Sequence, residues 1–361
     1  MKRRQKSDLT INLFLLIFLI SIPLSATAAE GEKTVKYETG FYYTVQKGDT
    51  LWDLSQKFSD TPWQWPEIWK ENNQIANPHR IYPGERIRLY RRRGAHGYGD
   101  GEGGGDKQKA TGEDGGDKQK ASGEDVLRMT KMIDFQYAAI QRVGFIRKNP
   151  VVPHGTIFKV EGRKEMISTG DLVYIRPSGN ADFKLGKRYT IFRTLKPIKN
   201  RKTKKYIGIQ HYFSGTLKVT LKRPEFVLAR VIAAFRPIRI GDLLMPYQRR
   251  LAHLEMNPSP EGLQGQIIES EEHTAMFGES AIAFIDKGGQ EGVVPGQIYW
   301  IFKQEQYRIN PDDKYDVALT PVLLGELLVL HAEKTTATVM ITDSRQPIRA
   351  GDKISAPFDL D

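Results

Sequence analysis

The chain has 361 residues, of which 54 are lysine or arginine and 43 are aspartate or glutamate, and its formal net charge is +11. It contains no cysteine, which excludes disulfide bonds, a lipid-modified cysteine and every enzyme class that uses a cysteine nucleophile. The length suits two or three domains, and the positive charge favours contact with anionic polymers without identifying one.

The first 28 residues have the layout of a secretory signal peptide. Basic residues at positions 2–6 precede an apolar run at 13–20, and small residues follow at 26–28. We predict a signal peptide at 1–28, with cleavage after Ala28 or Ala29. The apolar run is shorter than the roughly 20 residues that span a bilayer, so a retained anchor is the alternative. We expect an exported protein of the periplasm or cell envelope, with no stable membrane span after cleavage.

Residues 43–89 predict a compact unit of strand, helix, helix and strand. A β-prone segment at 43–46 ends at the turn-forming pair Gly48-Asp49. Thr50 can then cap a helix whose third residue is Asp53, and apolar residues at 51, 54 and 58 share one helical face. A second helix begins near Pro66. The chain then turns into a closing strand at 86–89.

Two motifs in this unit resemble those of a known family of domains. The opening motif is Tyr-Thr-Val-x-x-Gly-Asp-Thr-Leu-Trp from residue 43, and the closing motif is Ile-Tyr-Pro-Gly-x-x-Ile-x-Leu from residue 81. Residues 43–90 resemble a LysM domain, the bacterial module that binds N-acetylglucosamine-containing glycans, above all peptidoglycan. We set the predicted domain at 41–91. The resemblance implies an α+β fold of the βααβ type.

The resemblance also implies where the glycan binds. In that family the sugar lies in a shallow groove between the loop after the first strand and the loop before the last. Backbone groups and a small apolar patch suit an acetamido sugar. Asp49 and Thr50 have a second explanation, since they also suit a turn and a helix cap. The predicted glycan-binding residues are Gly48, Asp49, Thr50, Leu51, Asn77, Pro78, His79, Arg80 and Ile81.

The unit contains four tryptophans, of which Trp52 ends the opening motif. We expect Trp52 and Trp69 to fill the small core of the unit. Trp63 and Trp65, between the two helices, either join that core or extend the sugar-binding surface.

Residues 92–127 predict a flexible, low-complexity linker. The string at 104–114 recurs at 115–125, with Ser122 in place of Thr111. Bulky apolar residues are almost absent from this segment, so it cannot bury enough surface to fold.

The rest of the chain contains a repeat with an offset of 110 residues. The string 186–193 matches 296–303, 215–219 matches 325–329, and 237–242 matches 347–352. Short segments rich in Val, Ile, Tyr and Phe alternate with turns, which predicts two mainly-β modules at 128–247 and 248–361. Each is a barrel-like or sandwich-like fold of about six strands. The Gly-Asp pairs at 241–242 and 351–352 are interpreted as turns before the last strands.

The whole chain resembles uncharacterised exported bacterial LysM-domain proteins with a repeated β-rich C-terminal region, a resemblance that implies no activity. We therefore predict a non-catalytic glycan-binding protein, without metal or cofactor, whose β modules contact an envelope protein. A scaffold or accessory subunit of an envelope assembly is the alternative. A cell-wall hydrolase is a further one, because a pair of carboxylates can meet in space. The seven histidines do not have zinc-site spacing.

The basic run at 196–205 differs from its acidic counterpart at 305–316, which contains Asp312, Asp313 and Asp316. It is a solvated hairpin loop or a docking surface for an anionic polymer or acidic partner. A nucleic acid partner is not expected.

Overall fold

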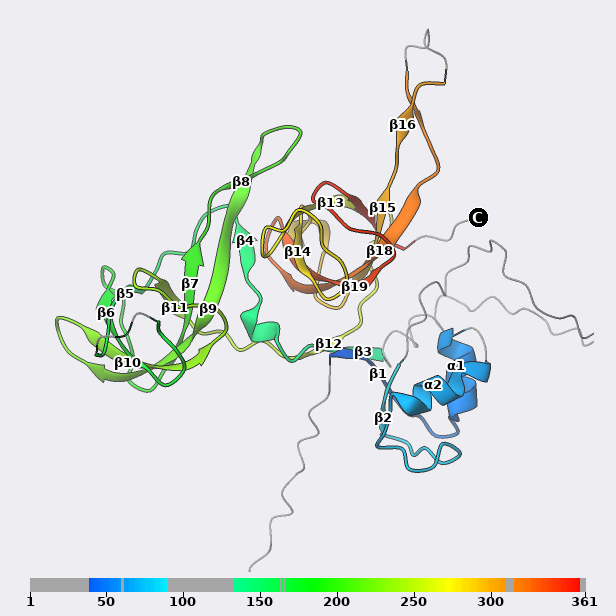
Figure 1. Cartoon of the computed structure of the whole chain (residues 1–361), viewed down its shortest axis with the longest axis horizontal. Helices are drawn as coiled ribbons and strands as arrows, with labels where there is room; N and C mark the ends of the chain where they lie inside the picture. Colours follow the sequence, from blue (N-terminus) through cyan, green and yellow to red (C-terminus); the bar gives the residue numbers. More distant parts are fainter. Residues whose placement is uncertain are drawn as a thin grey trace, which may run out of the picture. The chain divides into compact units, whose positions relative to one another are not determined.

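The structure is a computed structural model that describes residues 39–59, 62–89, 133–162, 164, 166–309 and 315–357 (Figure 1). The predicted signal peptide and the predicted linker at 92–127 lie outside these residues. Among the described residues, no helix has the length and apolar character needed to cross a membrane.

The N-terminal described unit, called here the head (residues 40–88), has the predicted order of strand, helix, helix and strand. Strands β1 and β2 are antiparallel, and Tyr43 lies opposite Ile87. Leu51, Leu54 and Ile68 from the two helices are fully buried against this pair of strands. The elements are β1 (Gly40–Thr44), α1 (Leu51–Ser59), the 3-10 turn η1 (Pro62–Gln64), α2 (Trp65–Lys70) and β2 (Arg86–Arg88).

Two strands from later in the chain extend the sheet of the head. Strand β3 (Ile133–Gln136) pairs with β1, and β12 (His253–Glu255) pairs with β3, so the sheet order is β12-β3-β1-β2. Phe135 lies opposite Phe41, with the ring centroids 4.9 Å apart, and is 2% exposed. Asp134 forms an ion pair with Arg86 of β2. The sequence predicted none of these contacts.

The first β region, called here the first barrel, has six strands that pair in a ring. The order is β10-β6-β5-β11-β7-β9, and β10 pairs with β9 as well as with β6, which joins the two ends. The 3-10 turn η2 (Ile140–Arg142) precedes strand β4 (Phe145–Arg147). Strand β4 pairs with residues 209–211, near the start of β9. The ring strands are β5 (Gly155–Val160), β6 (Leu172–Pro177), β7 (Arg188–Thr194), β9 (Tyr206–Lys222), β10 (Val227–Ala234) and β11 (Leu243–Pro246).

The second β region is a closed barrel with the order β13-β14-β19-β18-β15-β20. Each barrel has its own apolar core. A 3-10 turn, η3 (Gly289–Glu291), precedes β15. The strands of this second barrel are β13 (Gln264–Ser270), β14 (Ile282–Ile285), β15 (Ile298–Lys303), β18 (Val322–Ala332), β19 (Ala337–Ser344) and β20 (Lys353–Ser355).

Strand pairing in the two barrels follows the same register, 110 residues apart. An isolated bridge outside the strands also has its counterpart, with Ile167 opposite Ile238 and Phe277 opposite Ile348. Each barrel also has a hairpin after its third strand. In the first barrel it contains β8 (Ile198–Lys199), which pairs with the start of β9. In the second it contains β16 (Gln306–Tyr307) and β17 (Val317–Ala318). In the first barrel Val227 lies opposite Ile175, and in the second Ala337 lies opposite Ile285. In the same way, Leu243 opposite Phe192 corresponds to Lys353 opposite Phe302.

Lowering the pH should destabilise the fold through His211 of β9, which is fully buried. Its Nε2 accepts a hydrogen bond from the Val151 N–H (2.9 Å), and its Nδ1 lies 3.1 Å from the Ile209 carbonyl oxygen. Burial lowers the pKa of His211 from 6.5 to about 4. Between these values the unfolded chain binds a proton that the folded chain does not. The free energy of unfolding should therefore fall by up to about 3 kcal/mol as the pH drops through this window, measured by urea unfolding.

The variant His211→Gln should show a weaker dependence of stability on pH. His273→Gln, at an exposed position, is the matched control for the loss of one histidine. An unchanged slope in His211→Gln would contradict the assignment.

Candidate functional site

The turn between β1 and α1 is held by Asp49. Its Oδ2 accepts hydrogen bonds from the Gln46 N–H (2.7 Å) and the Tyr43 hydroxyl (2.8 Å). Gly48 has a φ of +98°, which a residue with a side chain adopts only with strain. Burial and the bond to Asp49 raise the pKa of Tyr43 well above its usual value. The Asp49 side chain is thus occupied within the protein.

The same turn occurs three more times in the two barrels. In each, a glycine with φ between +94° and +100° precedes an aspartate. The aspartate accepts the N–H of the residue three positions earlier at 2.7–3.0 Å. Because the barrels are outside the predicted glycan site, turn geometry is sufficient to explain Asp49. The three further turns are Ser168 with Gly170 and Asp171, Arg239 with Gly241 and Asp242, and Arg349 with Gly351 and Asp352.

The next two residues belong to the start of α1. The Thr50 hydroxyl oxygen accepts the Asp53 N–H (3.1 Å), and the same hydroxyl donates to the Asp53 carboxylate (2.6 Å), as predicted for the helix cap. Leu51 is 2% exposed and belongs to the core of the head. On this side of the predicted groove, Gly48 and Thr50 are exposed. This loop therefore offers a ligand mainly backbone groups.

The loop on the other side of the predicted groove is a tight turn. The Asn77 carboxamide oxygen accepts the His79 N–H, and the Asn77 carbonyl accepts the Arg80 N–H, both at 3.0 Å. Asn77, His79 and Arg80 are exposed, whereas Pro78 and Ile81 are half-buried. Ile81 packs on the same core as Leu51. The two loops thus rest on a shared apolar floor, and polar groups of the second loop face solvent.

Backbone bonds connect the bases of the two loops. The Val45 N–H donates to the Glu85 carbonyl at 2.8 Å, and the Gly84 N–H donates to the Val45 carbonyl at 2.9 Å. Gly84 has a φ of +90°. These bonds hold residues 45 and 84–85 side by side.

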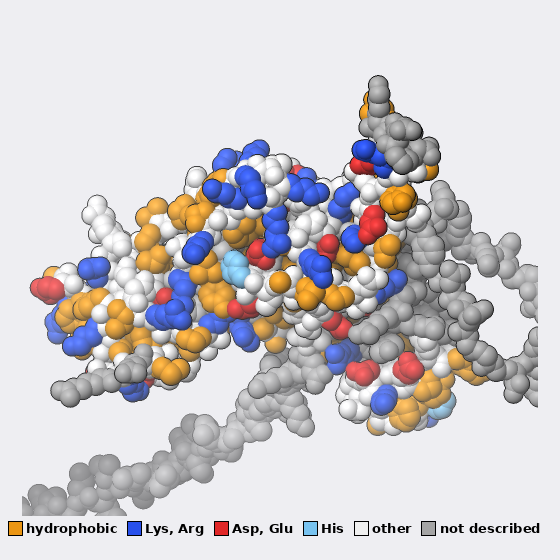
Figure 2. Space-filling view, turned by 45° about the horizontal axis from the view of Figure 1, so that its top comes forward, with side chains coloured by type: hydrophobic (Ala, Val, Ile, Leu, Met, Phe, Trp, Pro, Cys, Tyr) orange, Lys and Arg blue, Asp and Glu red, His pale blue; other side chains and the backbone are white. Residues whose placement is uncertain are grey.

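The tryptophans differ from the expectation. Trp52 is 42% exposed and Trp69 is 37% exposed, so the prediction that both fill the core is wrong. Trp52 lies edge-on to Trp63, with the ring centroids 4.9 Å apart, and Trp63 is 75% exposed. Trp69 donates its indole N–H to the Ile75 carbonyl (2.7 Å). Trp65 is half-buried against the core. In Figure 2 hydrophobic side chains gather on the visible face of the head, at the lower right.

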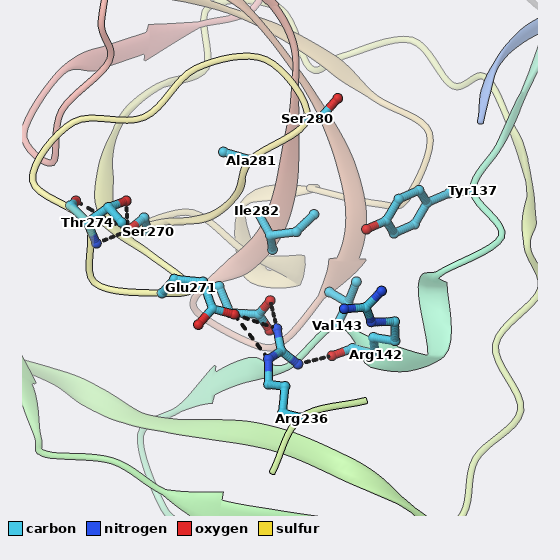
Figure 3. Close-up of a pocket in the computed structure, with 11 residues that line it drawn as sticks. Tyr137, Arg142, Val143, Arg236, Ser270, Glu271, Thr274, Ser280, Ala281 and Ile282 are labelled. Atoms are coloured by element: carbon cyan, nitrogen blue, oxygen red, sulfur yellow. Dashed lines mark hydrogen bonds and ion pairs between the residues drawn. The ribbon is translucent and has the colours of Figure 1, made fainter. Parts of the chain in front are cut away.

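A second concave site lies between the two barrels, with a volume of about 360 Å³. Figure 3 shows Arg236 pointing at Glu271 in this cavity. The Arg236 guanidinium lies 2.6 Å from the Glu271 carboxylate and 2.8 Å from that of Glu272. The other oxygen of Glu271 accepts the Gly144 N–H at 2.7 Å. Burial raises the pKa of Glu271, and Arg236 opposes that rise.

These contacts make the cavity a structural junction. Glu271 and Glu272 share one guanidinium, whereas a glycosidase pair needs one carboxyl free to give a proton and the other free to act as base or nucleophile. Across the described ranges, no three histidine or acidic side chains gather in a way that could hold a metal ion.

Comparison with known proteins identifies the head. Residues 43–89 match the family model of the LysM domain. The chain is also similar to the uncharacterized protein YqbP of Bacillus subtilis (strain 168), with 42% identity over 57 residues. That match covers 13% of this chain and 26% of the relative, so the chain spans about a quarter of the relative's length.

Replacing Asp49 tests whether its role is in the turn or with the ligand. Asp49→Ala removes the acceptor for two hydrogen bonds and should lower the free energy of unfolding by about 1–3 kcal/mol. Asp49→Asn keeps an acceptor oxygen and should lose less. Urea unfolding followed by tryptophan fluorescence measures both. Unchanged stability of Asp49→Ala, together with lost glycan binding, would contradict the structural role.

Proposed function

Residues 43–89 form a LysM domain, and from this premise we propose that the protein binds peptidoglycan or another N-acetylglucosamine-containing glycan. We place the sugar in the groove between residues 48–51 and 77–81. The observation that supports this placement is that both loops rest on one apolar floor while Asn77, His79 and Arg80 are exposed.

The chemistry of the groove suits an acetamido sugar. Gly48 and Thr50 are exposed just before α1. The first N–H groups of a helix have no carbonyl partner within the helix, so they can bind a carbonyl oxygen of a ligand. Half-buried Pro78 and Ile81 give an apolar surface for the acetyl methyl group. Asp49 and Leu51 act indirectly, through the turn and the core.

We further propose that Trp52 and Trp63 extend this surface. The pair lies on α1 and η1, the elements that follow residues 48–50, and Trp63 is largely exposed. Aromatic faces are favourable partners for the apolar face of a sugar ring. A longer glycan would reach this pair.

The rest of the chain then serves the glycan-bound head without catalysis. We propose an exported protein of the periplasm or cell envelope whose barrels, at 128–247 and 248–361, present a surface to an envelope protein. A scaffold in an envelope assembly is the second candidate. The sheet order β12-β3-β1-β2 favours it, because it fixes the head to both β regions.

A pull-down on purified insoluble peptidoglycan tests the groove. The full chain should pellet, and the double variant Asn77→Ala/Arg80→Ala should lose binding by at least about tenfold, because each lost hydrogen bond removes about 1 kcal/mol. Both positions are exposed, but Asn77 also accepts the His79 N–H in the turn. The loss therefore counts only if the circular dichroism spectrum and the melting temperature match those of the unchanged protein.

The matched control is Lys202→Ala/Lys204→Ala in the basic run. It should pellet like the unchanged protein. Binding that survives the groove variant and fails in the control variant would contradict the proposal and assign retention to the basic hairpin.

A further inference from the structure

The hairpin of the first barrel covers one outer face of the second barrel. Ile198 and Ile207 of this first hairpin (residues 196–209) pack against Ile268 and Phe284, which are 5% and 0% exposed. At its tip, the Arg201 guanidinium lies 3.3 Å from the Glu269 carboxylate. Apolar packing and one ion pair therefore hold the hairpin on this face.

Strand β4 completes the cover. The hydroxyl group of Thr336, just before β19, donates to the carbonyl of Ile146 on β4 (2.7 Å). The hydroxyl group of Thr338 on β19 donates to the carbonyl of Gly144, just before β4 (2.9 Å). Both threonines are 1% exposed. The covered face of the second barrel thus consists of Ile268, Phe284, Thr336 and Thr338.

The equivalent face of the first barrel has a different environment. Its residues, 110 positions earlier, are Phe158, Tyr174, Phe226 and Leu228. Phe158 is 42% exposed, and the other three are half-buried. The Tyr174 ring lies 6.2 Å from that of Phe158 and 5.4 Å from that of Phe226. This outer face is more apolar than its covered counterpart and more exposed.

The second barrel has the complementary feature, a hairpin with exposed apolar side chains. Val317 of this second hairpin (residues 304–321) holds the position of Ile207 and is 46% exposed. Tyr307 lies opposite it and is 61% exposed, and Leu319 is 41% exposed. Figure 1 shows the hairpin with β16 extending away from its own barrel, and orange side chains are visible on it in Figure 2. Residues 310–314 lie outside the described residues and are not counted among these side chains.

Charge also differs between the two sets. The first hairpin is basic and meets Glu269, whose counterpart on the first barrel is Lys159. The second hairpin lacks the basic run. Its Glu305 and Asp316 form ion pairs with Lys303 (2.8 Å) and Arg308 (3.1 Å). Because both of these carboxylates already have basic partners, the match between this hairpin and the face of the first barrel rests on the apolar side chains.

We propose that the second hairpin of one molecule docks on the outer face of the first barrel of a second copy of this chain. The contact between copies then repeats the contact that the first hairpin makes within the chain. Hairpin and face are different surfaces, so a dimer keeps one hairpin and one face free, and further copies add head to tail. If the heads bind glycan as proposed above, such a row would bind by many weak contacts at once.

The test is the mass of the exported chain in solution, measured by analytical ultracentrifugation without glycan at up to about 100 μM, where a contact with a Kd of 10 μM is well populated. The unchanged protein should form species larger than a dimer as concentration rises. The face variant Phe158→Asp and the hairpin variant Val317→Asp/Leu319→Asp should each remain monomeric. All three positions are exposed, so circular dichroism and melting temperature should not change.

Mixing the two variants gives the sharper result. The face variant keeps an intact hairpin and the hairpin variant keeps an intact face, so an equal mixture should form a dimer that grows no further. Val294→Asp, at another 42% exposed apolar position on the second barrel, should assemble like the unchanged protein. The proposal is overturned by a monomeric unchanged protein, by variants that still assemble, or by a mixture that stays monomeric. The peptidoglycan pull-down separates this proposal from the proposed function. If the unchanged protein assembles but does not bind peptidoglycan, the result counts against the proposed function alone.

Discussion

Backbone pairing between β1 and β3 is the constraint on which the structure of the head depends. Strand β1 is a member of the LysM domain and would be the edge of a two-stranded sheet without β3, and such small sheets are marginally stable. Phe135 supplies apolar area at this edge, and the Asp134 carboxylate neutralises Arg86 across it. Because β3 and β12 come from the segments before and after the first barrel, the sheet of the head is tied along the chain to both barrels.

The two barrels are joined by a different kind of contact. Glu271 is buried with Arg236 and the Gly144 N–H as its partners, so the cost of removing its charge from water is offset within the junction. Removal of one partner would leave a buried charge uncompensated, which favours a fixed arrangement of β4 against the second barrel. Within that arrangement the first hairpin covers its neighbour, and the second hairpin repeats the same design with an apolar surface exposed.

The parts of the fold that rest on local patterns were predictable. The order of strands and helices in the head followed from the turn at Gly48-Asp49 and the cap at Thr50. The spacing of Leu51, Leu54 and Phe58 places Trp52 off the buried face of α1, and this local signal is more specific than tryptophan's general preference for cores. Strand β3 was not predictable, because four residues carry little periodicity and their partners lie about 90 residues before and 120 residues after them in the chain. At the candidate site, the capping role of Thr50 was predictable, whereas the distinction between exposed Arg80 and buried Leu51 required the packing.

Hydrogen exchange of the intact protein tests the central claim that β3 and β12, from the segments that flank the first barrel, complete the sheet of the head. Backbone amides at 133–136 should exchange as slowly as those at 41–43, because opening either strand breaks the same β1–β3 hydrogen bonds. Exchange at 133–136 at the rate of an unstructured peptide, while 41–43 remain protected, would show that the LysM domain folds without β3 and would contradict the account.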